Sequence, residues 1–297
     1  MASALEENDW NTLLQRIKVG KCTPFLGAGV NSGILTVGSE IAKKLAGTHG
    51  CPFKDTTDLA RVTQVLAVEN DPMFPKEEVL RLLSEQLEKW KQSVDVNNFF
   101  GSEDQPLGVL AGLPLPIYMT TNYDDLIVKA LETHRKDPKR ELCRWNKYVT
   151  GKASVFDSAT GFEPTPATPI VFHLHGHDKV PESLVLTEDD YIDFLVNISR
   201  RQDLLPARIQ EAMTGASLLF VGYSLADLDF RVIFRGLVES LEGGLRRFSV
   251  AVQLPPQEAQ QQKYWEYYFR RMEVKVYWGD ARNFATELRD RWSRFEK

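Results

Sequence analysis

The sequence predicts an α/β fold built on a doubly wound parallel sheet with a helical insertion. Short, continuous apolar runs recur along the chain, and polar turns follow them, several leading directly into helical periods. A glycine-rich turn, GAGVNSG at 27–33, lies between a predicted strand and a predicted helix. Repetition of strand, turn and helix is typical of a Rossmann-like parallel sheet, because parallel strands need a crossover connection.

The predicted strands are short apolar runs bounded by turn residues, which is typical of strands buried on both faces. They are 23–26, 116–119, 170–174, 218–221, 248–254 and 274–277. Helical periods are predicted at 10–19 and 39–46, after 125 and 229, from about 257, and at the end of the chain. Residues 51–112 carry helical periods up to residue 87, and the Gly- and Pro-containing part at 90–112 is interpreted as loops. We interpret 51–112 as the helical insertion.

Composition limits the classes of protein. A net charge of −5 gives no general attraction to phosphate backbones, so direct nucleic-acid binding is not expected, and the basic stretch at 135–147 is interpreted as solvated surface. The three cysteines form no CxxC pair, which argues against a thiolate zinc site and against a disulfide framework. The first residues lack signal-peptide features, and no apolar run approaches the roughly 20 residues that cross a bilayer. A cytoplasmic protein without membrane contact is predicted.

The glycine turn has the context of a dinucleotide-binding turn. Gly27 and Gly29 permit a tight turn and a close approach to a pyrophosphate, with the following helix start supplying N–H donors. The spacing is GxGxxxG, and no acidic residue ends a second strand about 20 positions later, which disfavours a hydride-transfer site. The alternative is a glycine-rich turn that holds no ligand.

Polar turns follow three of the predicted strands: TTNYDD at 120–125, HGHD at 175–178 and GYSLADLD at 222–229. In doubly wound sheets, ligands bind beyond the carboxyl ends of the strands, so these turns are expected to converge. Other interpretations stay open. Asn122 could cap a helix, and His175 could be structural. His173, His175 and His177 alternate and could face one metal ion in an extended strand, but without a nearby carboxylate or thiolate cluster no metal is expected.

Four blocks, in order, carry a family resemblance: GAGVN at 27–31, TTNYD at 120–124, HLHG at 173–176 and VGYSLADLDF at 221–230. Together they resemble the sirtuin fold family, and most closely the sirtuin-like domains of bacterial anti-phage defence proteins. The resemblance implies one domain over 1–297, with a Rossmann-like core at 1–50 and 113–297 and the helical insertion at 51–112. It also implies NAD⁺ as the substrate.

The resemblance assigns roles to individual residues. Asn122 and His175 match the catalytic pair. Positions implied to bind NAD⁺ are Gly27, Ala28, Gly29, Asn31, Thr121, Asp124, Gly222, Ser224 and Asp280. Of these, Asn31 stands where many sirtuins have serine, and the match at Asp280 is loose.

The residue types suit cleavage of a nicotinamide–ribose bond. Loss of nicotinamide leaves an oxocarbenium-like ribose, as in glycoside cleavage. The neutral amide of Asn122 can orient a water molecule, and His175 can accept a proton. Deacetylating sirtuins carry a four-cysteine zinc module after the catalytic histidine, whereas residues 178–217 contain no cysteine and are predicted to form two helices. The expectation is therefore a fold with no zinc module and hydrolysis with no metal.

The leading hypothesis is an NAD⁺ glycohydrolase that yields nicotinamide and ADP-ribose and depletes NAD⁺ in anti-phage defence. By resemblance, its control is expected from homo-oligomer assembly or from a HerA-type hexameric ATPase partner. One alternative is an NAD⁺-dependent protein deacylase or ADP-ribosyltransferase. Another, from a different class, is a catalytically silent scaffold that binds NAD⁺ or ADP-ribose.

Overall fold

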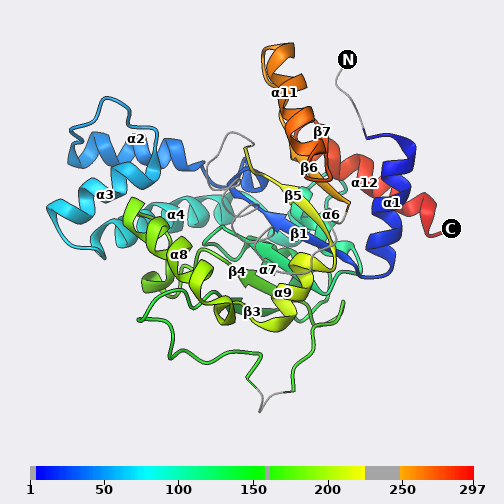
Figure 1. Ribbon diagram of the computed structural model, residues 1–297, viewed down its shortest axis with the longest axis horizontal. Helices are drawn as coiled ribbons and strands as arrows, with labels where there is room; N and C mark the ends of the chain where they lie inside the picture. Colours follow the sequence, from blue (N-terminus) through cyan, green and yellow to red (C-terminus); the bar gives the residue numbers. More distant parts are fainter. Residues whose placement is uncertain (1–4, 158–160, 225–247) are drawn as a thin grey trace.

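The computed structural model describes residues 5–157, 161–224 and 248–297. Within these residues, seven parallel strands form one sheet in the order β3-β4-β2-β1-β5-β6-β7 (Figure 1). The strands are β1 (Cys22–Leu26), β2 (Ile117–Thr120), β3 (Lys139–Leu142), β4 (Ile170–His173), β5 (Ser217–Val221), β6 (Ser249–Gln253) and β7 (Val274–Trp278). The first strand is central and the chain winds outward on both sides of it, so the prediction of a doubly wound, Rossmann-like parallel sheet is confirmed.

The strands are buried on both faces, and their side chains alternate between two hydrophobic cores. In β5, Leu219 and Val221 join one core, whereas Leu218 and Phe220 join the other. Successive strand residues point to opposite faces, so a continuous apolar run supplies both cores at once. Burying one such large side chain stabilises the fold by roughly 2 kcal/mol.

Helices cover both faces of the sheet, making three layers. The first core includes residues of α1 (Glu7–Lys18), α5 (Val96–Phe100), α6 (Pro106–Gly112), α7 (Leu126–Thr133) and α12 (Ala281–Phe295). The second includes residues of α8 (Glu188–Arg200), η3 (Gln202–Leu204), α9 (Ala207–Thr214) and α11 (Ala259–Arg270). Helix α8, for example, contributes the buried residues Phe194 and Ile198 to the second core.

Three helices form a side lobe with a separate core: α2 (Gly38–His49), α3 (Leu59–Glu69) and α4 (Phe74–Ser93) (Figure 1). The lobe is tied to the loop before α8, because buried Lys76 donates from Nζ to Leu184 O at 2.9 Å and to Asp190 Oδ1 at 3.0 Å. A buried ammonium group is stable only when it is paired in this way. The division into a core at 1–50 and 113–297 and an insertion at 51–112 stays a proposal, and the packing favours ending the insertion near residue 93.

The interpretation of 90–112 as loops was wrong. Residues 96–100 and 106–112 form α5 and α6, which pack against α7 and α12 in the first core. The edge strand β3 was missed because its sequence, KREL, lacks an apolar run. Two helices do form in 178–217, as predicted. The helix predicted after residue 229 lies outside the described residues.

No helix among the described residues is long and apolar enough to cross a membrane.

Candidate functional site

The turns that follow β1 and β5 meet at the carboxyl edge of the sheet, where main-chain hydrogen bonds join them. Gly27 N donates to Val221 O at 2.9 Å, and Gly29 N donates to Gly222 O at 2.8 Å. The short helix η1 (Ala28–Asn31) starts here. Sequence reasoning anticipated this convergence from the position of the turns at the strand ends.

The glycines of these turns pack directly on one another. A Cβ on Gly27 would lie 2.7 Å from Gly222 O, and one on Gly29 would lie 3.0 Å from the same atom. Gly222 has φ +85°, and its Cβ would lie 2.3 Å from Val30 N. Contact between turns therefore requires glycine at all three positions, whether or not a phosphate binds. Phosphate binding by residues 27–29 stays a prediction.

Asn122 joins the turn after β2 to the glycine turn. Its Nδ2 donates to Gly27 O at 3.1 Å, and its main-chain N donates to Thr120 Oγ1 at 2.9 Å. Asp125 occupies the N-cap position of α7 without a side-chain capping bond, and the first main-chain N–H of the helix, that of Leu126, donates to Asp124, so the helix-cap interpretation of Asn122 was wrong. The half-buried amide is instead fixed at the sheet edge, with its donor on the glycine turn.

Asp124 and Asn31 form a buried pair between the same two turns. Asn31 Nδ2 donates to Asp124 Oδ2 at 2.7 Å, and Leu126 N donates to Asp124 Oδ1 at 2.9 Å. Burial raises the pKa of Asp124 to about 6. Asn31 Oδ1 is also buried, and it has no hydrogen-bond partner among the described residues. An unpartnered buried acceptor is costly, by about 1–3 kcal/mol, and needs an explanation.

His175 lies on the side of α8. Its side chain is buried, with ring centroids 5.5 Å from Tyr191 and 5.2 Å from Phe194. Burial lowers the pKa of His175 to about 3, so the imidazole is neutral at pH 7. Within the described parts of the chain no hydrogen bond joins His175 to Asn122; the two residues follow strands β4 and β2, which are neighbours in the sheet. Their joint catalytic role stays a prediction.

Thr121 and the turn after β5 are connected by a residue that sequence reasoning missed. Tyr223 places its hydroxyl 2.9 Å from Thr121 Oγ1 and 3.0 Å from Leu26 O. No pattern in the sequence singles out this tyrosine, because its partners are about 100 and 200 residues away in the chain. Ser224 is exposed, and the remainder of the VGYSLADLDF block lies outside the described residues.

Asp280 is an exposed residue after β7, the far edge strand. It caps α12, accepting from Asn283 N at 2.7 Å and from Asn283 Nδ2 at 3.0 Å. This capping accounts for the residue type without a ligand. Strands β5 and β6 separate β7 from the central strand, and among the described residues Asp280 forms its side-chain hydrogen bonds with Asn283 and not with the turns described above.

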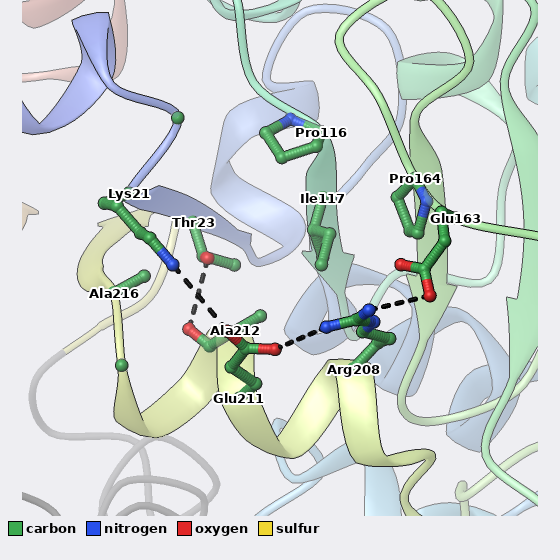
Figure 2. A pocket seen from close by; sticks show the side chains of 12 residues that line it. Lys21, Thr23, Pro116, Ile117, Glu163, Pro164, Arg208, Glu211, Ala212 and Ala216 are labelled. Carbon is green, nitrogen blue, oxygen red and sulfur yellow. Dashed lines mark hydrogen bonds and ion pairs between the residues drawn. The ribbon is translucent and has the colours of Figure 1, made fainter.

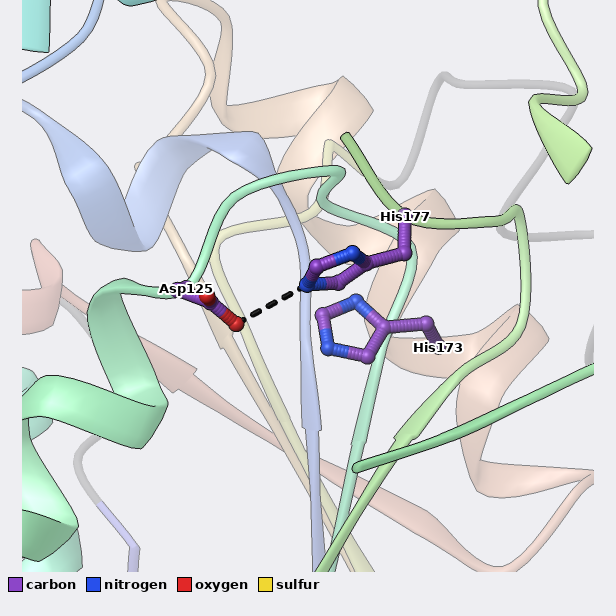
Figure 3. Close-up of side chains that lie close together, drawn as sticks. All are labelled: Asp125, His173 and His177. Atoms are coloured by element: carbon purple, nitrogen blue, oxygen red, sulfur yellow. Dashed lines mark hydrogen bonds and ion pairs between the residues drawn. The ribbon is translucent and has the colours of Figure 1, made fainter. Parts of the chain in front are cut away.

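The three alternating histidines do not face one way. Strand β4 ends at His173, and Gly176 has φ +89°, which turns the chain beside η2 (Pro181–Ser183). The ring centroids of His173 and His177 are 4.5 Å apart (Figure 3). His175 instead packs against Phe194 of α8. A carboxylate does lie beside the pair: His177 Nε2 is 2.9 Å from Asp125 Oδ1. Sequence reasoning missed it because Asp125 comes from the turn after β2.

A hollow of about 210 Å³ lies at the opposite, amino end of the strands (Figure 2). Its polar side chains pair with one another: Arg208 bridges Glu163 at 2.7 Å and Glu211 at 2.9 Å, and Lys21 lies 3.7 Å from Glu211. These pairs are about half exposed. None of the residues predicted to be functional lines this hollow.

A doubly wound parallel sheet with polar turns gathered at its carboxyl edge defines the Rossmann-like class of α/β domain, in which ligands bind beyond that edge. Comparison with known families agrees and is more specific. The model of the SIR2-like domain family matches residues 116–272, and the chain belongs to that family.

Among curated proteins, the chain is similar to several that are called NAD(+) hydrolase ThsA. The protein of Bacillus cereus (strain MSX-D12) is 26% identical over 75% of this chain and 41% of its own length. That of Enterococcus faecium is 28% identical over 72% of this chain and 39% of its own length. That of Cytobacillus dafuensis is 30% identical over 42% of this chain and 22% of its own length. The chain thus matches about two fifths or less of each relative.

Proposed function

We propose that this chain is an NAD⁺ glycohydrolase, which cleaves the nicotinamide–ribose bond to give nicotinamide and ADP-ribose. Similarity to proteins named NAD(+) hydrolase supports the substrate and the reaction. The observation that carries the proposal is the bond from Asn122 Nδ2 to Gly27 O. It fixes the predicted catalytic amide against the predicted phosphate turn, as a site for one nicotinamide nucleotide requires.

The chemistry needs little beyond positioning. The transition state has positive charge on the ribose, so a neutral amide can orient the attacking water without forming an ion pair. Asn122 keeps its Oδ1 for that task while Nδ2 is held by the glycine turn. His175 is proposed to accept a proton from the water or from a ribose hydroxyl; burial lowers the pKa of its imidazole to about 3, so in this state of the chain it is a weaker base than an exposed histidine.

The Asn31–Asp124 pair supports a nicotinamide pocket. The carboxamide of nicotinamide offers two N–H donors, and Asn31 Oδ1 is a buried acceptor whose hydrogen-bonding capacity is unused by the described residues. Asp124 fixes the orientation of that amide through Nδ2, so that Oδ1 is presented to the ligand. In this proposal Asn31 holds the leaving group and Asp124 orients Asn31.

The remaining positions are proposed to hold the rest of the dinucleotide. Gly27, Ala28 and Gly29 lie beside the pyrophosphate, and Thr121 lies at the entrance between two turns. Gly222, Ser224 and Asp280 are assigned to the adenosine half. The capping role of Asp280 weakens its assignment, because a helix cap alone accounts for it.

The direct test is incubation of the purified chain with NAD⁺, followed by chromatography of the products. Equal release of nicotinamide and ADP-ribose without any acceptor is expected. Products that appear only with an acyl-lysine peptide or a protein acceptor would favour a deacylase or an ADP-ribosyltransferase instead. Calorimetric binding of NAD⁺ with no nicotinamide release over hours would favour a catalytically silent scaffold.

We further propose that the reaction depletes cytoplasmic NAD⁺ in anti-phage defence and is controlled by assembly. Unregulated loss of NAD⁺ would harm the host, so control by self-association or by a HerA-type hexameric ATPase fits the activity. The support is the family resemblance together with the relatives' names. Gel filtration of the chain with such an ATPase tests the partner, and separate elution at micromolar concentration contradicts it.

A further inference from the structure

Three side chains lie close together beside the Asn122 turn: Asp125 from the turn after β2, and His173 and His177 around the end of β4. One donor atom from each lies within 4.8 Å of the other two. Figure 3 shows the two rings and the carboxylate directed toward one another. Both histidines are buried, and Asp125 is largely so. Imidazole nitrogen and carboxylate oxygen are the ligands that divalent transition metals accept.

The hydrogen bond of His173 fixes its tautomer. Nδ1 lies 3.2 Å from the main-chain O of Asn122, which can only accept, so Nδ1 carries the hydrogen. Nε2 is then an unprotonated acceptor, and it is buried with no hydrogen-bond partner among the described residues. A metal-bound histidine typically donates its other ring N–H to a carbonyl or carboxylate, as His173 does here.

The hydrogen bonds of His177 show what metal binding would change. Its Nδ1 lies 3.2 Å from Asp178 Oδ1, an oxygen that is buried and has no hydrogen-bond partner within the described ranges. Its Nε2 faces Asp125 at 2.9 Å. Nδ1 also accepts a hydrogen bond from Lys179 N at 3.1 Å, so the ring hydrogen is on Nε2 and is donated to Asp125. If Nε2 binds a metal ion, that hydrogen moves to Nδ1, where it is donated to Asp178 in place of the bond from Lys179 N. The ion would thus give the orphaned His173 Nε2 a partner, and this buried atom is the observation that favours a bound ion.

We propose that Asp125, His173 and His177 bind one divalent transition metal ion of the Zn²⁺ type, with a fourth position open to water. Tetrahedral zinc is commonly held by three such ligands at about 2.0–2.2 Å, so the three donors close by a small movement around the ion. The ion joins the turn that carries Asn122 to the end of β4. This site is independent of the proposed NAD⁺ cleavage.

Two cations already contact Asp125 and compete with a metal. Arg140 reaches both carboxylate oxygens, at 2.7 and 3.0 Å, and Lys179 Nζ lies 3.1 Å from Oδ2. The Lys179 side chain is 68% exposed and can move into water, whereas Arg140 is held more closely. Nearby positive charge lowers metal affinity, so removing the charge of Lys179 is expected to tighten binding.

The experiment measures Zn²⁺ binding to the full chain by equilibrium dialysis after treatment with a chelator, with Co²⁺ absorption as a second readout. One Zn²⁺ per chain is expected, with affinity weakened at least tenfold in His173→Asn and His177→Asn. His49→Asn, which changes a surface histidine, is the matched control and should bind as the wild type does. Circular dichroism checks that each variant is folded.

Lys179→Gln keeps the test decisive if a buried histidine variant fails to fold, because Lys179 is exposed. Tighter Zn²⁺ binding by Lys179→Gln supports the site. Wild-type binding no tighter than that of folded His177→Asn, or binding unchanged by Lys179→Gln, would overturn it. In that event Asp125, His173 and His177 form a hydrogen-bonded cluster without a metal ion.

Discussion

The two ends of the same sheet carry very different polar groups. At the carboxyl end, Asn31, Asp124 and His175 are buried, and the first two are held by hydrogen bonds within or between turns. At the amino end, Arg208 and Glu211 are about half exposed and pair with other exposed charges around a hollow. The hollow and the residues predicted to be functional therefore lie at opposite ends of the sheet.

The polar groups at the two ends of the sheet also differ in their free-energy cost. Exposed ion pairs such as Arg208–Glu163 contribute about 0–1 kcal/mol and cost little to form or lose. Buried polar groups cost free energy unless they are fully paired. Asn31 Oδ1 and His173 Nε2 are buried without a partner among the described residues. Polar atoms retained at such a cost are typical of binding and catalytic sites.

The largest expected effect is on NAD⁺ turnover. Asn122→Ala and His175→Ala are each expected to lower it by about 100-fold or more, through loss of a positioned amide or of a proton acceptor. Arg208→Ala, at the amino end, should leave turnover unchanged. Nicotinamide release is measured by chromatography. Near-normal turnover in either of the first two variants removes that residue from its proposed role.

The second-largest expected effect is on the free energy of unfolding. Gly222→Ala is expected to lower the free energy of unfolding by about 3 kcal/mol, because its Cβ would lie 2.3 Å from Val30 N at a φ of +85°. Gly33→Ala is the matched control: its φ is +86°, but a Cβ there meets nothing within 4 Å, so a loss of only about 1 kcal/mol is expected. Urea denaturation compares them. Equal losses would mean that backbone strain alone, and not contact between turns, selects glycine at 222.

The smallest effect is expected at the amino end. Arg208→Ala and Glu163→Ala should each change the free energy of unfolding by less than about 1 kcal/mol, since the pair is exposed and screened by salt. A double-mutant cycle measured by urea denaturation isolates the pair. A coupling free energy well above 1 kcal/mol would show that the amino end is more rigidly built than its exposure suggests.

How much the sequence predicts depends on how local the signal is. The strand around Leu219 and Phe220 was predicted because a buried parallel strand is apolar at every position. Edge strand β3 was missed, since an edge position tolerates the charged residues KREL. Loops were expected at 90–112, but residues 96–100 and 106–112 are helical. Packing of α5 and α6 against the core outweighs the low helix propensity of the local Gly and Pro residues.

The candidate site shows the same limit. The Asn122 turn was identified because it directly follows a strand. The contact of Gly222 with Val30 and that of Asp125 with His177 join distant parts of the chain. Only the tertiary fold brings such residues together, so spacing along the sequence could not reveal them. The catalytic roles of Asn122 and His175 stay predictions.

The central position of β1 has a consequence for how the chain is made. The main-chain O of Leu26 accepts hydrogen bonds from the hydroxyl groups of Thr120 and Tyr223, which lie 94 and 197 residues further along the chain. During synthesis on the ribosome, β1 therefore cannot pair until β2 and β5 have emerged, and its apolar residues stay exposed until then. Such distant pairing slows folding and favours aggregation of nascent chains. Fragments that stop before residue 217 are expected to depend on chaperones or to precipitate.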